Sequence, residues 1–120
     1  MKNVSQNTSS ISHISPHVRQ IIQQFANETK QLLQENIMAE YLFGSYATNT
    51  QTPLSDIDIL IIVKHFTPDL QRQVSGLASD YSLEHDLYIS PILQDREVWE
   101  KNEHYQTLFY QEVIRHGIPL

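Results

Sequence analysis

The segment Ile57 to Val63 constrains the fold of this 120-residue chain more than any other stretch. It is dense in β-branched side chains, which favour extended backbone, and its run of apolar residues is typical of a strand buried in a protein core. Asp58 interrupts the run, which is also far too short to span a membrane. We therefore expect a soluble domain built on a sheet that contains this strand.

Helical periodicity precedes and follows this strand. Ser15-Pro16 has the form of an N-cap followed by a proline at the first helical position, and apolar residues then recur at helical spacing to about Asn36. Thr67-Pro68 repeats the signal, and a second helical pattern continues from Leu70 to Tyr81. The sequence thus predicts one long helix before the strand and one after it.

Two further strands are expected. Met38 to Phe43 is a short apolar run that ends at a glycine, and Leu87 to Leu93 is a second one, in which Pro91 indicates an edge strand or an irregularity. Between the first two strands, Ser45 to Thr52 is polar and lacks an apolar repeat. This stretch predicts a tight turn, with at most one turn of helix, followed by a loop.

Two short helices complete the chain. Asp95 is placed to cap a helix that carries Val98 and Trp99, and a last helix runs from about His104 to a stop at Gly117. The expected order is helix, strand, turn, strand, helix, strand, helix, helix. This order indicates an α/β (α+β) fold with a small mixed sheet and helices packed on it.

Length and composition indicate one domain. Residues 1–15 are rich in Ser, Asn and Gln and are expected to form a flexible N-terminal arm. Residues 16–120 then make a single domain, and a hydrophobic content of 40% is enough for a core. The N-terminus lacks the apolar stretch of a signal peptide, so we expect a cytoplasmic protein.

The charge balance and the lack of cysteine exclude several functions. The chain carries 14 acidic and 8 basic residues, a net charge of −6, and its cations form no stripe. Nucleic-acid affinity rests on phosphate neutralisation, so a nucleic acid is not expected as the main partner. The absence of cysteine excludes disulfides, thiolate catalysis and Cys-ligated zinc.

Asp56 and Asp58 stand two residues apart at the start of the central strand. Side chains at this spacing share one face of a strand, and two carboxylates so close repel each other unless a cation lies between them or one is protonated. Mg²⁺ prefers oxygen ligands and is usually held by one or two carboxylates together with substrate phosphates. The pair therefore indicates half of a metal site that a triphosphate completes, although a lone pair of this kind more often caps a loop.

Gly44-Ser45 directly follows the expected strand that ends at Phe43. A glycine lets a phosphate approach the backbone, and a serine hydroxyl with neighbouring N–H groups can donate to phosphate oxygens. Ser45 can at the same time serve as an N-cap. The dipeptide alone is a weak signal, but a carboxylate pair that opens the next strand ten residues later makes it much stronger.

Gly44-Ser45, ten intervening residues and Asp56-x-Asp58 together resemble the DNA polymerase β-like nucleotidyltransferase superfamily. The flanking residues are similar to its small prokaryotic branch, the minimal nucleotidyltransferases. The resemblance covers about residues 38–120 and continues through the segments Leu83-Glu84-His85, Ile89-Ser90-Pro91-Ile92 and Phe109-Tyr110 to Gly117-Ile118. It implies a nucleotidyltransferase fold.

The resemblance also implies a function. Members of this branch are commonly antitoxins paired with a HEPN-domain ribonuclease toxin, and they transfer AMP from ATP, with Mg²⁺, to a tyrosine of that toxin. In this superfamily a third carboxylate on a neighbouring strand completes the metal site. Asp86 is the candidate here, because it would share strand parity with Tyr88 and Ser90, and Glu84 is the alternative.

The chain departs from this pattern after Ala47. Relatives often carry a basic residue and then a glycine, whereas Thr48 and Asn49 stand here. Asparagine tolerates the left-handed backbone that glycine would supply, so the turn is expected to survive. The missing cation motivates an alternative, a non-catalytic module that inhibits its partner by binding alone. Transfer to a small molecule is a third possibility, but such enzymes usually carry an extra helical domain.

Overall fold

The computed structural model describes residues 12–120. Its elements follow the expected order, with a short 3-10 turn and a two-residue strand in addition. Most of the expected arm, residues 1–11, lies outside the described residues. The bounds of the elements are α2 Pro16–Leu33, η1 Gln34–Asn36, β1 Ile37–Phe43, α3 Ser45–Thr48, β2 Ile57–Val63, α4 Pro68–His85, β3 Ile89–Asp95, α5 Arg96–His104, α6 Leu108–His116 and β4 Ile118–Pro119.

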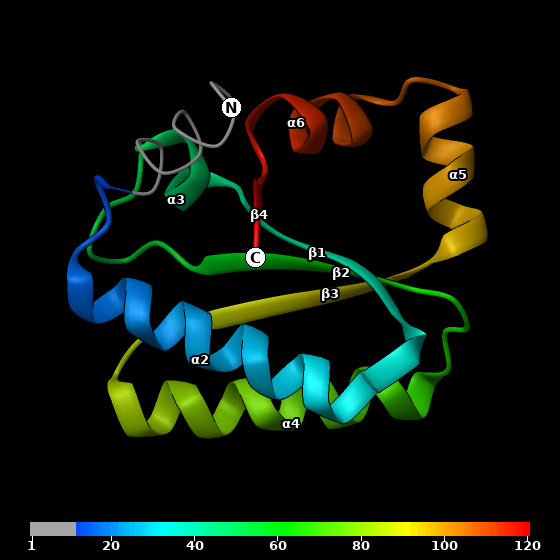
Figure 1. Cartoon of the computed structure of the whole chain (residues 1–120). Helices are drawn as coiled ribbons and strands as arrows, with labels where there is room; N and C mark the ends of the chain where they lie inside the picture. The colour runs from blue at the N-terminus through cyan, green and yellow to red at the C-terminus, as the bar shows by residue number, and fades with distance from the viewer. Residues whose placement is uncertain (1–11) are drawn as a thin grey trace.

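Four strands form one mixed sheet in the order β3-β2-β1-β4 (Figure 1). β2 runs parallel to β3 and antiparallel to β1, and β4 runs antiparallel to β1. The edge position of β3 agrees with the indication given by Pro91, because proline cannot donate to a neighbouring strand. The antiparallel pairing brings the end of β1 to the start of β2, where Phe43 lies opposite Asp58.

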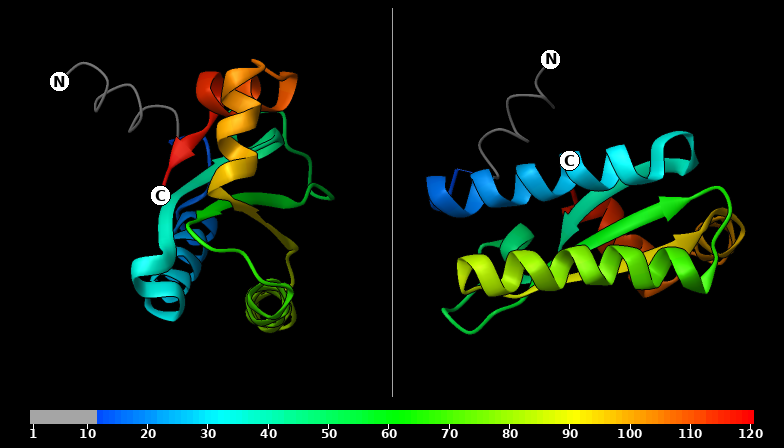
Figure 2. Two further views of the ribbon diagram at one scale, coloured as in Figure 1. Left: turned by 90° about the vertical axis from the view of Figure 1, so that its right-hand side faces the viewer. Right: turned by 90° about the horizontal axis from the view of Figure 1, so that it is seen from below.

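Helices cover both faces of the sheet (Figures 1 and 2). α2 and α4 pack on one face, where Ile57, Ile59, Ile61 and Val63 of β2 belong to the main core. The alternate side chains Leu60 and Ile62 face the opposite way and pack with residues of α5 and α6. β2 is therefore buried on both faces, which explains its nearly uninterrupted apolar sequence.

The helix starts follow the predicted capping signals. The Ser15 hydroxyl accepts from the Val18 N–H at 3.3 Å, and the Thr67 hydroxyl accepts from the Leu70 N–H at 3.2 Å. The Asp95 carboxylate accepts from the Glu97 N–H at 2.9 Å. Each cap satisfies a backbone donor that has no partner within its own helix. Gly117 is the C-cap of α6, as predicted.

Residues 12–15, which we expected in the flexible arm, pack on the domain. Ile14 is only 2% exposed and belongs to the main core. Next to it, the His13 Nε2 lies 2.6 Å from the backbone carbonyl of Tyr46 in α3, an oxygen to which it can only donate. The packed part of the chain thus begins before Pro16 and reaches the turn that follows β1.

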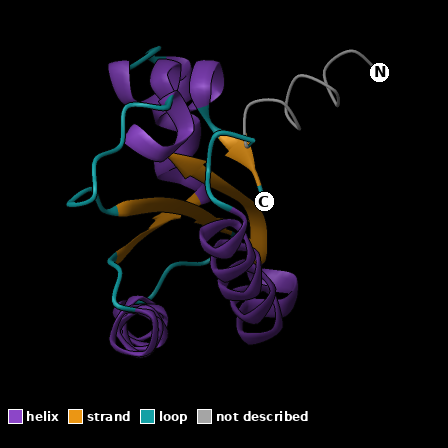
Figure 3. Ribbon diagram, turned by 90° about the vertical axis from the view of Figure 1, so that its left-hand side faces the viewer, coloured by secondary structure: helices purple, strands orange, loops and turns teal. Residues whose placement is uncertain are grey.

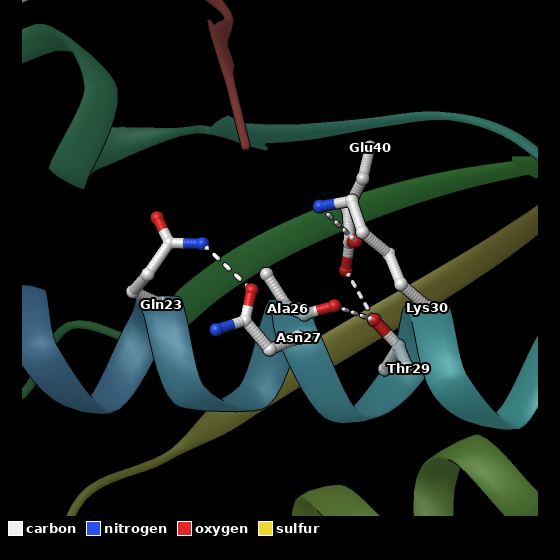
Figure 4. Close-up of polar contacts among 6 residues, drawn as sticks. All are labelled: Gln23, Ala26, Asn27, Thr29, Lys30 and Glu40. Carbon is white, nitrogen blue, oxygen red and sulfur yellow. Dashed lines mark hydrogen bonds and ion pairs between the residues drawn. The ribbon is translucent and has the colours of Figure 1, made fainter.

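A buried polar cluster joins α2 to β1 (Figure 4). Glu40 is 4% exposed, and its carboxylate lies 2.8 Å from the Thr29 hydroxyl and 3.5 Å from the Lys30 Nζ. Burial raises the pKa of Glu40, and the contacts with Thr29 and Lys30 oppose that rise. Because the Thr29 hydroxyl also lies 2.9 Å from the Ala26 carbonyl and has one proton, a protonated Glu40 would satisfy both contacts.

Among residues 12–120, no helix combines the length and the apolar character that crossing a bilayer requires.

Candidate functional site

The turn between β1 and α3 requires a glycine for two reasons. Gly44 has φ +73° and ψ −153°, a backbone conformation that residues with a Cβ rarely adopt. A Cβ at this position would also lie 3.2 Å from the Cγ of Asp58 and collide with its Oδ2. The turn and the carboxylate therefore lie in direct contact.

α3 is a single helical turn, as the polar sequence predicted. Asn49 ends it with φ 58° and ψ 37°, in the left-handed conformation expected of a residue that replaces glycine. The Thr48 hydroxyl lies 3.3 Å from the Gly44 carbonyl and 2.9 Å from the Thr50 hydroxyl, so it is held within the turn. Among residues 12–120, the Ser45 hydroxyl makes no hydrogen bond. It is therefore available to donate to a phosphate.

Asp56 and Asp58 lie at the edge of the sheet where this turn ends. Asp56 is exposed in the loop just before β2, and Asp58 is half-buried within the strand. Asp58, Leu60 and Ile62 occupy every second position of β2 and so share one face of the sheet. The side chain of Asp58 therefore lies on the face that α6 covers further along the strand. Within residues 12–120 neither carboxylate has an ion-pair partner.

The surroundings of Asp58 disfavour its ionised carboxylate when no cation is bound. Burial raises its pKa, and the charge of Asp56 raises it further. Both effects disfavour the ionised form of Asp58. A cation bound between the two carboxylates would replace their repulsion with attraction to the metal. The donor set is all oxygen, which suits Mg²⁺.

Asp86 does not lie on a strand, which corrects our expectation. α4 continues to His85, and Asp86 is its C-cap in the left-handed conformation, with φ 53° and ψ 48°. β3 begins only at Ile89, so Asp86 does not share a strand face with Tyr88 and Ser90 as we had expected. Glu84, the alternative, is exposed on the last turn of α4.

Ser90 is the β3 residue paired with Asp58 in the parallel register. Just before it, the Tyr88 carbonyl accepts the Ile57 N–H at 2.7 Å. Within residues 12–120 no three His, Cys, Asp or Glu side chains are grouped so that they could hold a metal. Asp56 and Asp58 would therefore supply two ligands to a bound cation, and a triphosphate would have to supply others.

His13 is the residue near this site that we did not predict. Its ring donates to the carbonyl of Tyr46, the second residue of α3. The two residues are 33 positions apart, so no local pattern connects them. The one available signal was Ile14, an apolar residue directly before an N-cap.

Fold and site together define a class of protein. A short mixed sheet places a glycine-serine turn against Asp58, two residues after Asp56, an arrangement suited to a nucleoside triphosphate and a divalent cation. The family of nucleotidyltransferase domains matches residues 22–114. The chain belongs to this family, and it is a nucleotidyltransferase.

Two curated relatives come from Methanocaldococcus jannaschii. The protein named "Putative protein adenylyltransferase MJ0141" is 33% identical over 102 residues, which cover 84% of this chain and 96% of the relative. A second, named "Putative protein adenylyltransferase MJ1305", is 30% identical over 76 residues, which cover 61% of this chain and 52% of the relative. The likeness to MJ0141 extends over nearly the whole of that protein.

Solved structures share the fold. A toxin-antitoxin crystal structure with AMP-PNP superposes with a TM-score of 0.55 at 21% identity, over 80% of this chain and 69% of that one. A structure of the toxin-antitoxin MntA-HpeT gives a TM-score of 0.54 at 21% identity, over 82% and 70% of the two chains. These likenesses confirm the nucleotidyltransferase fold.

Proposed function

We propose that this protein is a cytoplasmic antitoxin that transfers AMP from ATP to a tyrosine of a HEPN-domain toxin, with Mg²⁺ as cofactor. The observation that carries the proposal is the contact between the Gly44 turn and Asp58, beside the second carboxylate of Asp56. The names of the M. jannaschii relatives support a protein acceptor, and the toxin-antitoxin neighbours support a toxin as partner.

Each residue of the site has a distinct task in this reaction. Gly44 leaves room for the phosphates, and Ser45 donates to the β- and γ-phosphate oxygens. Asp56 and Asp58 would hold Mg²⁺, which when bound neutralises phosphate charge and makes the α-phosphorus more electrophilic. Asp58 is half-buried at the start of β2, so a cation that it held would lie there, close to the turn.

The transfer is a substitution at the α-phosphorus. The tyrosine oxygen forms the new bond to phosphorus, the bond between the α-phosphorus and the bridging oxygen breaks, and pyrophosphate leaves with the electron pair. The tyrosine proton passes to a carboxylate or to solvent. Positioning and electrostatic stabilisation supply most of the rate in such reactions.

Intact-mass spectrometry of the neighbouring-gene product tests the proposal. Incubation of that product with this protein, ATP and Mg²⁺ should add the mass of an AMP group, and proteolysis should place it on a tyrosine. The double variant Asp56→Asn/Asp58→Asn should remain folded and lose transfer by at least about a hundredfold, as expected when a metal site is lost. Asp80→Asn, which removes an exposed charge of α4 away from the site, is the matched control.

Two outcomes would contradict the proposal. Full transfer by the double variant would remove Asp56 and Asp58 from the mechanism. A stable complex with no gain of mass would favour the non-catalytic module, and the threonine at position 48 would then explain it.

Separate Asp86→Asn and Glu84→Gln variants test the third carboxylate, because only a metal ligand would change the Mg²⁺ concentration needed for half-maximal transfer.

A further inference from the structure

Ser90 is the neighbour of Asp58 on β3. The two residues are paired in the parallel register, and paired residues of adjacent strands lie about 4.8 Å apart. On the other side of β2, Asp58 is paired with Phe43 of β1. Figure 3 views the molecule from the end of the sheet at which β2 and β3 begin, which is where these residues lie. Of the two cross-strand neighbours of Asp58, Ser90 is therefore the polar one.

The side chains of Ser90 and Asp58 lie on the same face of the sheet. Ile89 and Leu93 of β3 belong to the main core on the face that α2 and α4 cover. Ser90 is out of step with them along the strand and so faces the opposite way. Asp58 shares its face with Leu60, which packs with residues of α5 and α6. Both polar side chains thus lie on the α5 and α6 face.

This part of the face is open to solvent. Ile92, the next β3 residue on the same face, is 40% exposed, whereas its β2 partner Leu60 is 0% exposed. The two short helices therefore cover β2 further along the strand and leave the beginning of β3 accessible. Ser90 and Asp58 are both half-buried. A small ion can reach the space beside them without a change in the fold.

The Ser90 hydroxyl has no hydrogen-bond partner among residues 12–120, although it stands beside a carboxylate. The backbone around it is nevertheless held in place. The Gln71 side chain of α4 donates to the Pro91 carbonyl at 3.4 Å and accepts from the Leu93 N–H at 3.2 Å. The hydroxyl is thus a fixed polar group that is available to a ligand which Asp58 attracts.

The neutrality of Ser90 determines how firmly a cation can be held. Asp56 and Asp58 carry two negative charges when ionised, enough to balance Mg²⁺ and no more. Within residues 12–120 no three His, Cys, Asp or Glu side chains are grouped as metal ligands. A carboxylate at position 90 would strengthen metal binding, because affinity rises with the charge of the ligands, but it would also repel a triphosphate. A hydroxyl avoids this repulsion.

We propose that Ser90 is a neutral member of the cation site, with its hydroxyl directed at the cation that Asp56 and Asp58 hold. The consequence is that the protein binds the cation together with the nucleotide and only weakly without it. The inference rests on the proposed function and adds to it a residue of the site and an order of binding.

Titration with Mn²⁺ tests the inference without any transfer reaction. Mn²⁺ takes the same oxygen ligands as Mg²⁺, and its electron paramagnetic resonance reports binding directly. Ser90→Asp should tighten Mn²⁺ binding in the absence of nucleotide by at least about tenfold, since it adds a charged ligand. Ser79→Asp is the matched control, because Ser79 is exposed on α4, which covers the other face. It should change the affinity by less than about twofold.

Two smaller changes at position 90 test the hydroxyl itself. Ser90→Ala should weaken Mn²⁺ binding in the presence of AMP-PNP about fivefold, the effect expected for one lost polar contact. Ser90→Thr retains the hydroxyl and should stay within about twofold of the wild type. Urea unfolding with a chelator should give Ser90→Ala and the wild type the same stability. A purely structural role would instead change the stability and leave the Mn²⁺ affinity unaltered.

Other outcomes would overturn the inference. An equal gain of affinity in Ser79→Asp would mean that net charge alone attracts the ion. Equal Mn²⁺ affinities in Ser90→Ala and the wild type, with AMP-PNP present, would remove the hydroxyl from the site. Circular dichroism checks that each variant remains folded.

The experiment also separates this inference from the proposed function. The expected changes in Mn²⁺ affinity, with no AMP added to the neighbouring-gene product, would retain Ser90 in a cation site and overturn the proposed function. Transfer by the wild type, with the same Mn²⁺ affinity in every Ser90 variant, would retain the function and remove Ser90 from the site.

Discussion

Asp58 shows at the scale of one residue how a carboxylate that we propose holds a metal lowers the stability of the metal-free protein. Its carboxylate is half-buried beside Asp56, and both features raise its pKa. We expect Asp58→Asn to stabilise the metal-free protein by roughly 0.5–1 kcal/mol, because it removes a buried charge and a repulsion. The same variant should lose nucleotidyl transfer.

Urea unfolding in the presence of a chelator measures this difference. The sign of the pH dependence follows from the raised pKa. The folded state holds the Asp58 proton to higher pH than the unfolded state does, so the charge lowers stability as pH rises through that window. Asp80→Asn is the control, and a loss of stability in Asp58→Asn would mean that the carboxylate has a stabilising partner.

His13 offers a second prediction at this scale. Its hydrogen bond to the Tyr46 carbonyl holds α3, and α3 follows the Gly44 turn, which we propose binds phosphate. We expect His13→Ala to weaken AMP-PNP binding about fivefold, which corresponds to the loss of one hydrogen bond worth about 1 kcal/mol. Calorimetry measures the affinity. His13→Gln, which retains a donor, should recover most of it, and His65→Ala should have no effect.

At the scale of the elements, the contact between α2 and β1 determines how the free energy of unfolding changes with pH. Glu40 has a raised pKa, so the folded chain binds more protons than the unfolded chain between the ordinary value of 4.5 and the raised one. Stability therefore falls as pH rises through this window and remains lowered above it. We expect Glu40→Gln to add about 1 kcal/mol at about pH 7 and nothing at about pH 4.

Thermal unfolding across this pH range tests the prediction. The amide of the variant can donate to the Thr29 hydroxyl, which then donates to the Ala26 carbonyl, so the cluster stays satisfied. Glu35→Gln, an exposed change in the neighbouring η1, is the control. A loss of stability in Glu40→Gln at neutral pH would show that the ion pair with Lys30 outweighs the cost of burial.

The elements also show what a sequence can predict. The caps at Ser15, Thr67 and Asp95 and the strand from Ile57 are local signals, and the structure has each where it was expected. Asp86 was misplaced because two competing patterns overlap there. The helical spacing of α4 continues past Tyr81, and an aspartate accepts the left-handed C-cap that ends it.

Contacts between distant segments were beyond local patterns. The bond from His13 to Tyr46, the pairing of β4 with β1 and the buried position of Glu40 all depend on how the sheet brings segments together. The turn and the carboxylate pair were predictable because one short stretch of chain contains both. Their roles in binding nucleotide and metal remain predictions.

At the scale of the whole molecule, ligand binding should appear as added stability. A ligand that binds only the folded state stabilises it by about 2.7 kcal/mol at one hundred times its Kd. We expect ATP analogue and Mg²⁺ together to raise the melting temperature, and each alone to raise it much less. In the Asp56→Asn/Asp58→Asn variant, the two ligands together should raise the melting temperature no more than each alone. A rise equal to that of the wild type would show that nucleotide and Mg²⁺ bind without the carboxylate pair.

The hairpin of β1 and β2 has a consequence for inheritance. The turn and both aspartates lie within residues 37–63, ahead of α4 and β3. During synthesis the turn and the two aspartates that we propose hold nucleotide and metal are therefore complete before α4 and β3 have been made. Over generations, substitutions in the later segments leave this stretch of sequence unchanged. One hairpin can thus be inherited intact by a lineage of proteins whose later helices differ.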